Sequence, residues 1–76
     1  MRGSLGSMEY ERFLKALIKS RETKGLTQGE VARLLKKPQS YVSRCESGER
    51  RVDVVELAAF AKIYGKPLAY FVRDHN

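Results

Sequence analysis

The chain has 76 residues, 42% of them hydrophobic, with 15 Lys and Arg against 9 Asp and Glu, a formal net charge of +6 at pH 7. This length allows one small domain with a single core. The lone cysteine excludes an intramolecular disulfide, and no apolar run approaches the roughly 20 residues that a membrane span needs. We therefore expect a soluble, cytoplasmic protein whose basic balance suits a polyanionic partner or simply favours solubility.

Residues 1–7 have the composition of an expression tag or cloning scar, because Gly and Ser crowd there and a second methionine, Met8, follows. We expect the folded domain to span residues 8–76. The spacing of its apolar residues predicts a first helix over residues 8–24 that ends at Gly25. The inward positions of this helix are Tyr10, Phe13, Leu14, Leu17 and Ile18.

A hydroxyl residue followed three positions later by a carboxylate marks the start of a second helix. Thr27 and Glu30 have this capping-box spacing, which satisfies free backbone amides at a helix start. The helix is expected to be about two turns long, because Pro38 disfavours helical geometry at Lys37. Its inward positions are Val31, Ala32, Leu34 and Leu35.

A third helix is predicted from Gln39 to about Ser47, with Gly48 as a left-handed cap. Only Val42 and Cys45 are suited to burial, so the rest of this helix is available to face outward. The polar residues of that outer face are Gln39, Ser40, Ser43, Arg44 and Ser47.

Asp53 predicts the N-cap of a fourth helix that continues to Gly65, and Pro67 suits the first turn of a short fifth helix. No segment shows the strict alternation of a strand, so the fold class is all-α with five short helices. The inward positions are Val54, Leu57, Ala58, Phe60, Ala61 and Tyr64 in the fourth helix, and Leu68 and Phe71 in the fifth.

The short connection between the second and third helices, and the polar surface of the third, are typical of a helix-turn-helix, whose second helix enters the DNA major groove. The sequence resembles the lambda-repressor and Cro-type (XRE) family of helix-turn-helix proteins. This resemblance implies a compact five-helix lambda-repressor-like domain that binds double-stranded DNA. It is carried by Leu26–Gln28, Val31–Ala32, Gln39–Arg44 and Glu46–Arg50, followed by Leu57, Ala61, Gly65 and Leu68.

The resemblance also implies roles for matching residues, and their chemistry agrees. A glutamine amide can pair bidentately with adenine, and an arginine guanidinium with guanine. A polar donor at the start of the second helix suits a phosphate, because the helix dipole favours an anion there. The expected base-reading residues are Gln39, Ser40, Ser43 and Arg44. The expected phosphate-binding residues are Thr27, Gln28, Lys37, Tyr41, Arg50 and Arg51.

Two positions depart from the family pattern. Lys36 stands where the family commonly has a glycine in the turn, and a left-handed lysine there would cost on the order of 1 kcal/mol. Pro38 stands where the family often caps the third helix with serine or threonine. A lysine beside the groove can offset its strain by binding a phosphate.

Several apolar residues remain once the inward positions are assigned, and together they suit a self-complementary patch between two copies of the chain. A twofold dimer would place two reading helices about 34 Å apart and would bind a pseudo-palindromic operator. The expected dimer-interface residues are Val52, Val55, Ala59, Ile63 and Tyr70.

These expectations describe a sequence-specific transcriptional regulator, most simply a homodimeric repressor from a bacterium or phage that associates with the nucleoid. A protein-interaction adaptor or antitoxin-like module with the same fold is the alternative, since fold alone does not determine function. Single-stranded RNA binding is a weaker third option, because Tyr41 alone offers an aromatic platform.

No pattern in the sequence predicts catalysis or a bound group. Glu30, Glu46 and Glu49 have no His, Ser or Cys beside them in a nucleophilic or acid–base arrangement, and Glu46 is expected to pair with an arginine. Cys45 is expected to pack in the core, and His75 has no second ligand for a metal. We therefore expect no enzymatic activity, metal, cofactor or small-molecule ligand.

Overall fold

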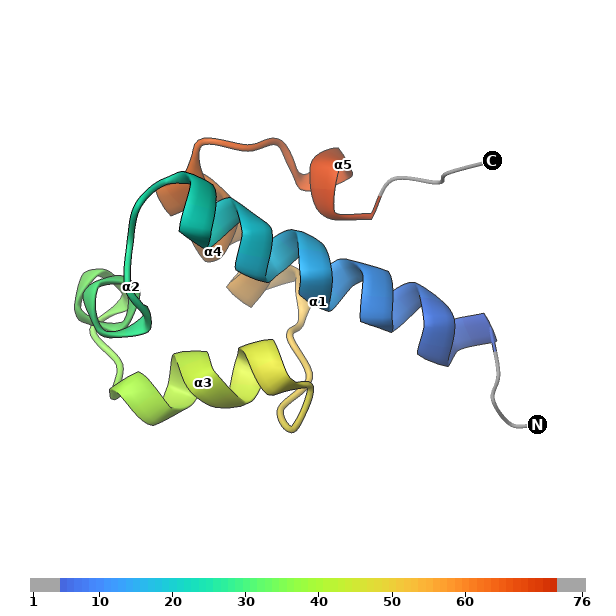
Figure 1. Ribbon diagram of the computed structural model, residues 1–76, viewed down its shortest axis with the longest axis horizontal. Coiled ribbons are helices and arrows are strands. Elements are labelled where there is room, and N and C mark those ends of the chain that lie inside the picture. The colour runs from blue at the N-terminus through green and yellow to red at the C-terminus, as the bar shows by residue number, and fades with distance from the viewer. Residues whose placement is uncertain (1–4, 73–76) are drawn as a thin grey trace.

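The computed structural model describes residues 5–72, and within this range the chain forms five helices and no strand. They are α1 (Leu5–Thr23), α2 (Gln28–Leu35), α3 (Gln39–Ser47), α4 (Val54–Tyr64) and α5 (Leu68–Phe71). In Figure 1, α1 runs along the length of the molecule, with α3 on one side of it and α5 on the other. The predicted all-α class with five helices is confirmed.

The start of α1 differs from the prediction. The helix begins at Leu5 and ends at Thr23, whereas residues 8–24 were expected. Residues 5–7 contain no proline, and a single glycine within a helix weakens it without breaking it, so the helix continues into the segment assigned to a tag. The origin of residues 1–7 stays a prediction.

Two capping boxes fix the starts of α2 and α4. Thr27 Oγ accepts the Glu30 backbone N–H at 3.1 Å, while the Thr27 N–H donates to Glu30 Oε1 at 2.8 Å. Asp53 and Glu56 make the same reciprocal pair, at 2.8 and 3.0 Å. Each box satisfies two backbone amides that a helix start would otherwise leave free. Both helix starts therefore lie where the sequence predicted them.

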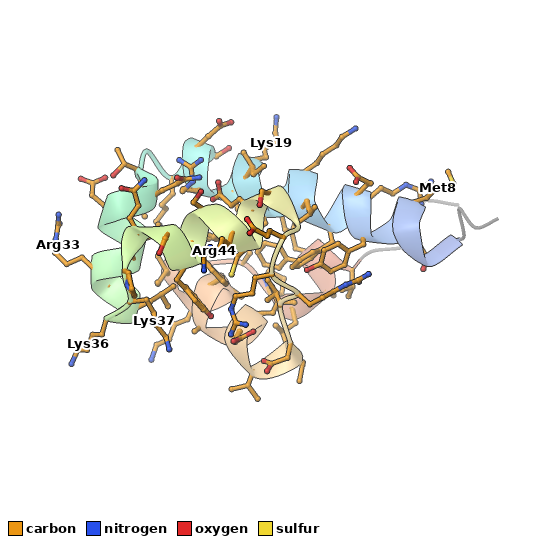
Figure 2. The ribbon with its side chains drawn as sticks, turned by 90° about the horizontal axis from the view of Figure 1, so that it is seen from below. Met8, Lys19, Arg33, Lys36, Lys37 and Arg44 are labelled. Atoms are coloured by element: carbon orange, nitrogen blue, oxygen red, sulfur yellow. The ribbon has the colours of Figure 1, made fainter. Side chains whose placement is uncertain are left out.

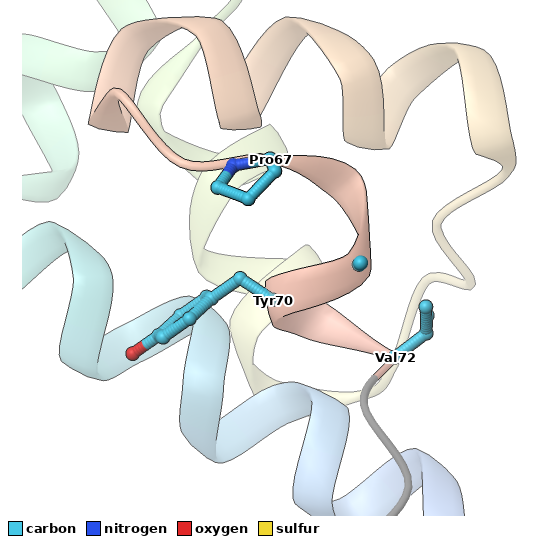
Figure 3. A pocket seen from close by; sticks show the side chains of 4 residues that line it. Pro67, Tyr70 and Val72 are labelled. Carbon is cyan, nitrogen blue, oxygen red and sulfur yellow. The ribbon is translucent and has the colours of Figure 1, made fainter.

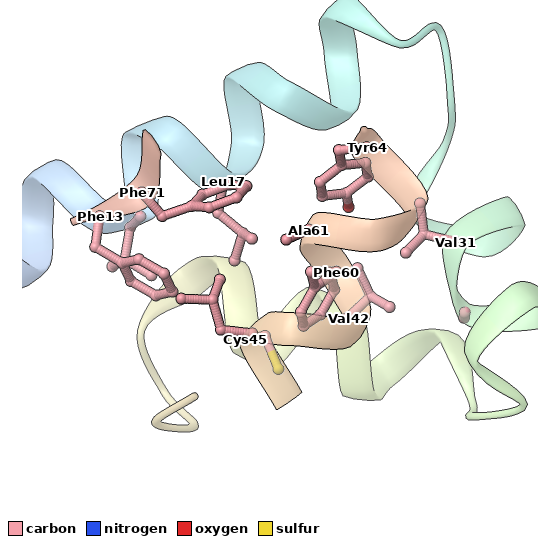
Figure 4. Packing of buried hydrophobic residues seen from close by; sticks show 12 residues of the cluster. Phe13, Leu17, Val31, Val42, Cys45, Phe60, Ala61, Tyr64 and Phe71 are labelled. Atoms are coloured by element: carbon pink, nitrogen blue, oxygen red, sulfur yellow. The ribbon is translucent and has the colours of Figure 1, made fainter. Parts of the chain in front are cut away.

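One core holds the five helices together, and Figure 4 shows side chains from α1, α2, α3, α4 and α5 meeting in it. Phe60 and Leu17 are the largest side chains that are completely buried. Cys45 is fully buried there too, as predicted, and burial raises the pKa of its thiol. The core consists of Phe13, Leu14, Leu17, Val31, Ala32, Val42, Cys45, Leu57, Phe60, Ala61, Tyr64 and Phe71.

Four residues predicted to face inward are exposed instead: Leu34, Val54, Ala58 and Leu68. Val54 and Leu68 are the first residues of α4 and α5, and both side chains are exposed there. Leu34 and Ala58 lie on the flank of their helices, about a third of a turn from the centre of the buried stripe. The apolar stripes of these helices are thus wider than the surfaces they bury.

Candidate nucleic-acid interface

The connection between α2 and α3 is closed by Lys36 in the left-handed conformation, with φ 60° and ψ 45°. Its N–H donates to the Arg33 carbonyl at 3.1 Å, and the Lys37 N–H donates to the Ala32 carbonyl at 2.9 Å. These are the bonds that a glycine usually supports at a helix end. Pro38 is the N-cap of α3 and makes no side-chain capping bond. Lys36 thus adopts the left-handed conformation that would carry the strain considered above, and Pro38 lies one residue before the first residue of α3.

A largely buried ion pair joins α1 to α3. Arg21 Nε donates to Glu46 Oε2 at 2.6 Å, and Arg21 Nη2 donates to Glu46 Oε1 at 3.1 Å. The two side chains retain 14% and 4% of their exposure. This bidentate hydrogen bonding raises the pKa of the Arg21 guanidinium. Glu46 thus pairs with an arginine as predicted, although the sequence did not identify which one.

Two residues predicted to contact DNA, Gln28 and Gln39, are linked to this ion pair by hydrogen bonds. Gln28 Nε2 donates to Glu46 Oε1 at 2.9 Å, which turns the Gln28 carbonyl toward α3. Gln39 Nε2 donates to that carbonyl oxygen at 3.3 Å. Arg21, Glu46, Gln28 and Gln39 therefore form one hydrogen-bonded chain, and the amide orientation of each glutamine follows from a fixed carboxylate.

The outer face of α3 presents the four predicted base-reading residues together. Gln39, Ser40 and Arg44 are exposed, and Ser43 is half-buried. Their spacing of one, three and one residues places them on one side of the helix. In Figure 2, which looks onto this face, Arg44 extends outward from α3.

Cations gather around α3. Figure 2 places Arg33, Lys36 and Lys37 together at the end where α2 meets α3. Lys37 Nζ lies 5.2 Å from the centre of the Tyr41 ring, and the Arg50 guanidinium carbon lies 5.0 Å from it. Both cations are thus held beside α3 at a distance at which cation–π attraction acts.

The core also holds Tyr41 in place, through its contact with Phe60. Its ring stacks on Phe60 with centroids 6.4 Å apart and an interplanar angle of 4°. Burial is the main cause of the raised pKa of its phenol. Tyr41 is half-buried and firmly packed, so it is a poor platform for a base from a single-stranded nucleic acid.

Arg50 and Arg51 lie in the loop between α3 and α4 and have different partners. Arg50 pairs through Nη2 with Glu56 Oε2, so Glu56 both caps α4 and holds an arginine. The Arg51 guanidinium carbon lies 4.2 Å from the centre of the Tyr10 ring. Tyr10 Oη also accepts the Val52 N–H at 3.0 Å.

The sequence did not predict the contacts that three residues make at this interface: Arg21 and Tyr10 on α1, and Glu56 on α4. Their partners are 25, 42 and 6 residues away. The capping-box spacing of Glu56 after Asp53 was a local signal for one of them. Tyr10 was assigned to the core alone, and its hydroxyl was the one hint of a polar contact.

The predicted phosphate-binding residue Thr27 uses its hydroxyl oxygen to cap α2. A hydroxyl that accepts one hydrogen bond can still donate its own proton. Thr27 is the N-cap and Gln28 the first residue of α2, and the phosphate-binding role of both stays a prediction.

The five predicted dimer residues do not form a uniform surface. Val55 and Ala59 are exposed on α4, with Val55 at 75%. The other three are half-buried and pack against the core: Val52, Ile63 and Tyr70. Beside α5, Pro67, Ala69, Tyr70 and Val72 line an open apolar pocket (Figure 3).

Two further features concern residues 5–72 only. No helix in this part of the chain is long and apolar enough to cross a membrane. The same residues contain no group of three or more His, Cys, Asp or Glu side chains placed to hold a metal ion. His75 lies outside the described residues.

The left-handed turn between two short helices, the exposed polar face of α3 and the surrounding cations define a helix-turn-helix DNA-binding domain. A model of the helix-turn-helix family matches residues 17–71, which is more than half of the chain. The chain belongs to this family, in its XRE type, and is thus a DNA-binding regulator. Searches of curated proteins and of solved structures found no match.

Proposed function

We propose that this protein is a sequence-specific regulator of transcription that represses its target as a homodimer bound to a pseudo-palindromic operator. The observation that carries the proposal is the chain from Arg21 through Glu46 and Gln28 to Gln39, which orients a glutamine amide on the exposed face of α3. The protein would regulate its target by occupying the operator. Its place of action would be the bacterial cytoplasm, where it binds the nucleoid or phage DNA.

Base reading is assigned to the outer face of α3. Gln39 gives one amide hydrogen to Gln28, which leaves its other N–H and its carbonyl for an adenine edge. Arg44 is exposed and can donate two parallel hydrogen bonds to a guanine. Ser40 and Ser43 supply hydroxyls that accept or donate. Because the Gln39 amide is held in one orientation before DNA binds, it supports recognition of specific bases in addition to electrostatic attraction to the phosphates.

Phosphate binding is assigned to the residues around that face. The start of α2 offers hydrogen-bond donors together with the positive end of a helix dipole. The cations beside α3 add sequence-independent attraction that weakens as salt rises. The phosphate-binding residues are Thr27, Gln28, Lys37, Tyr41, Arg50 and Arg51.

Dimerisation is assigned to the apolar outer side of α4. Val55 and Ala59 form its centre, and the exposed Val54 and Ala58 widen it. Twofold pairing of this face would remove exposed apolar area from water and place two copies of α3 about 34 Å apart. Val52, Ile63 and Tyr70 would then border the interface.

An arginine comparison tests the assignment of base reading. Arg44→Ala should cost about 1–3 kcal/mol on the preferred site and relax base preference at one position. Arg50→Ala should weaken binding to all duplexes by a similar factor. Arg12→Ala is the matched control, because it removes the same charge from an exposed position on α1. Equal losses on all sequences for Arg44→Ala would refute its role as a base reader.

The adaptor or antitoxin-like function is the second candidate, and the exposed valines of α4 favour it, because this apolar face also suits a different protein. Salt separates the two functions. DNA binding should weaken steeply as salt rises, whereas an apolar protein interface should change little.

A further inference from the structure

The loop of residues 48–53, between α3 and α4, is fastened to two consecutive turns of α1. The Val52 N–H donates to Tyr10 Oη at 3.0 Å. At the other end of the loop, a Cβ added to Gly48 would lie 3.0 Å from Leu14 Cδ1, so the backbone approaches α1 closely there. Tyr10 and Leu14 are one helical turn apart and form a single support for the loop.

Tyr10 is itself held by the core. Its ring centroid lies 5.1 Å from that of Phe13, which is buried and contacts Phe71 edge-on at 6.5 Å. The aromatic series fixes the plane of the Tyr10 ring. The Arg51 guanidinium carbon lies 4.2 Å from the centre of this ring.

The contact with the Tyr10 ring uses none of the side-chain N–H groups of Arg51 in a hydrogen bond to an oxygen acceptor. A guanidinium group has five N–H donors in one plane, and a cation–π contact leaves these donors free for an anion. Arg51 is exposed, and residues 5–72 contain no carboxylate that forms an ion pair with it. Arg50 differs, because Glu56 already neutralises part of its charge. Arg51 is therefore the loop cation better suited to an external anion.

We propose that Tyr10 is a positioning residue, which holds the Arg51 guanidinium and the 48–53 loop so that Arg51 binds a backbone phosphate of DNA. The inference rests on the proposed function, and it names a residue before the segment 17–71 that matches the family model. Tyr10 orders the arginine before binding, so less side-chain entropy is lost when the phosphate is bound.

A double-mutant cycle on a labelled duplex of random sequence tests the inference. The contact is independent of sequence, so absence of sequence preference would count against the proposed function and not against this contact. Arg51→Ala should make the log–log salt dependence of binding shallower by about 0.9, the loss of one phosphate contact. Arg12→Ala, on the exposed side of α1, should leave that slope unchanged.

Tyr10→Leu should weaken binding by about two- to fivefold in the wild-type background, the loss of an exposed cation–π contact. In the Arg51→Ala background the same change should alter binding by less than about twofold. Tyr10→Phe keeps the ring and should preserve the wild-type salt slope. Equal effects of Tyr10→Leu in both backgrounds, or an unchanged slope in Arg51→Ala, would overturn the proposal.

A measurement on the unaltered protein removes dependence on how the variants fold. In its NMR spectrum, the Arg51 Hδ resonances should be shifted upfield by the Tyr10 ring current, and the Val52 amide should exchange slowly with solvent. Random-coil Arg51 shifts would overturn the proposal, as would absence of any salt-dependent DNA binding.

Discussion

Replacing Glu46 with glutamine should strongly destabilise the fold, because the carboxylate accepts three hydrogen bonds at once. Its oxygens receive two N–H groups of Arg21 and one of Gln28. A glutamine substitutes an NH₂ group for one of these oxygens, so that a donor faces a donor. The Arg21 guanidinium would then stay charged in a largely buried position without its anion.

The magnitude follows from burial. Removing one partner of a buried ion pair costs about 3–5 kcal/mol, and the 14% exposure of the Arg21 side chain reduces our expectation to about 2–4 kcal/mol. For a domain of this size, that loss corresponds to a fall in Tm of about 10–25 °C. The same substitution at Glu56 is the matched control, because the Arg50–Glu56 pair is more exposed, at 43% and 21%. Glu56→Gln should cost less than about 1 kcal/mol.

Thermal unfolding followed by circular dichroism at neutral pH measures both variants. A double variant, Arg21→Met with Glu46→Leu, should be less destabilised than Glu46→Gln, because it leaves no unpaired buried charge. A loss below about 1 kcal/mol for Glu46→Gln, or one equal to that of Glu56→Gln, would refute this reasoning.

Lys36→Gly should raise stability by about 1 kcal/mol, because it relieves a left-handed lysine, and an unchanged or lower Tm would contradict this. Gly48→Ala should destabilise more than Gly25→Ala in thermal unfolding: both have positive φ, but only at Gly48 does a Cβ meet a neighbour, Leu14 Cδ1 at 3.0 Å. The buried Cys45 thiol has a pKa above its ordinary value of 9.0, so the unfolded chain loses this proton first. Its stabilising contribution is complete below pH 9 and falls as pH rises further, so Cys45→Ala should show a smaller alkaline decrease in Tm, and an equal decrease would contradict the assignment.

The helices could be predicted from the sequence because their ends depend on local chemistry. Thr27 with Glu30 marks the start of α2, and the left-handed residues Gly48 and Gly65 close α3 and α4. The extension of α1 to Leu5 was missed, since composition indicates the origin of a segment and not its conformation. The sequence also predicted too wide a buried stripe on α2 and α4, where Leu34 and Ala58 are exposed, because the buried width depends on which neighbouring element covers each flank of a helix.

The site could be predicted in part. The polar face of α3 follows from helical spacing, which is why the four residues predicted to read bases are found on one side of the helix. The contacts that hold this face in place are non-local: Arg21 reaches Glu46 across 25 residues, and Tyr10 reaches Val52 across 42. Periodicity within one helix carries no information on such pairs, so the sequence could predict the polar face of α3 but not the contacts that hold it in place.

Selection of bound sequences from a random duplex pool, at physiological salt, tests most directly whether α3 reads DNA as part of a dimer. If α3 reads DNA as part of a dimer, the selection should enrich two inverted half-sites whose centres are about 10 base pairs apart, and Arg44→Ala should lose base preference at one position of each half-site. Recovery of unenriched sequences by the wild-type protein, or of the same site with undiminished preference by Arg44→Ala, would contradict this prediction.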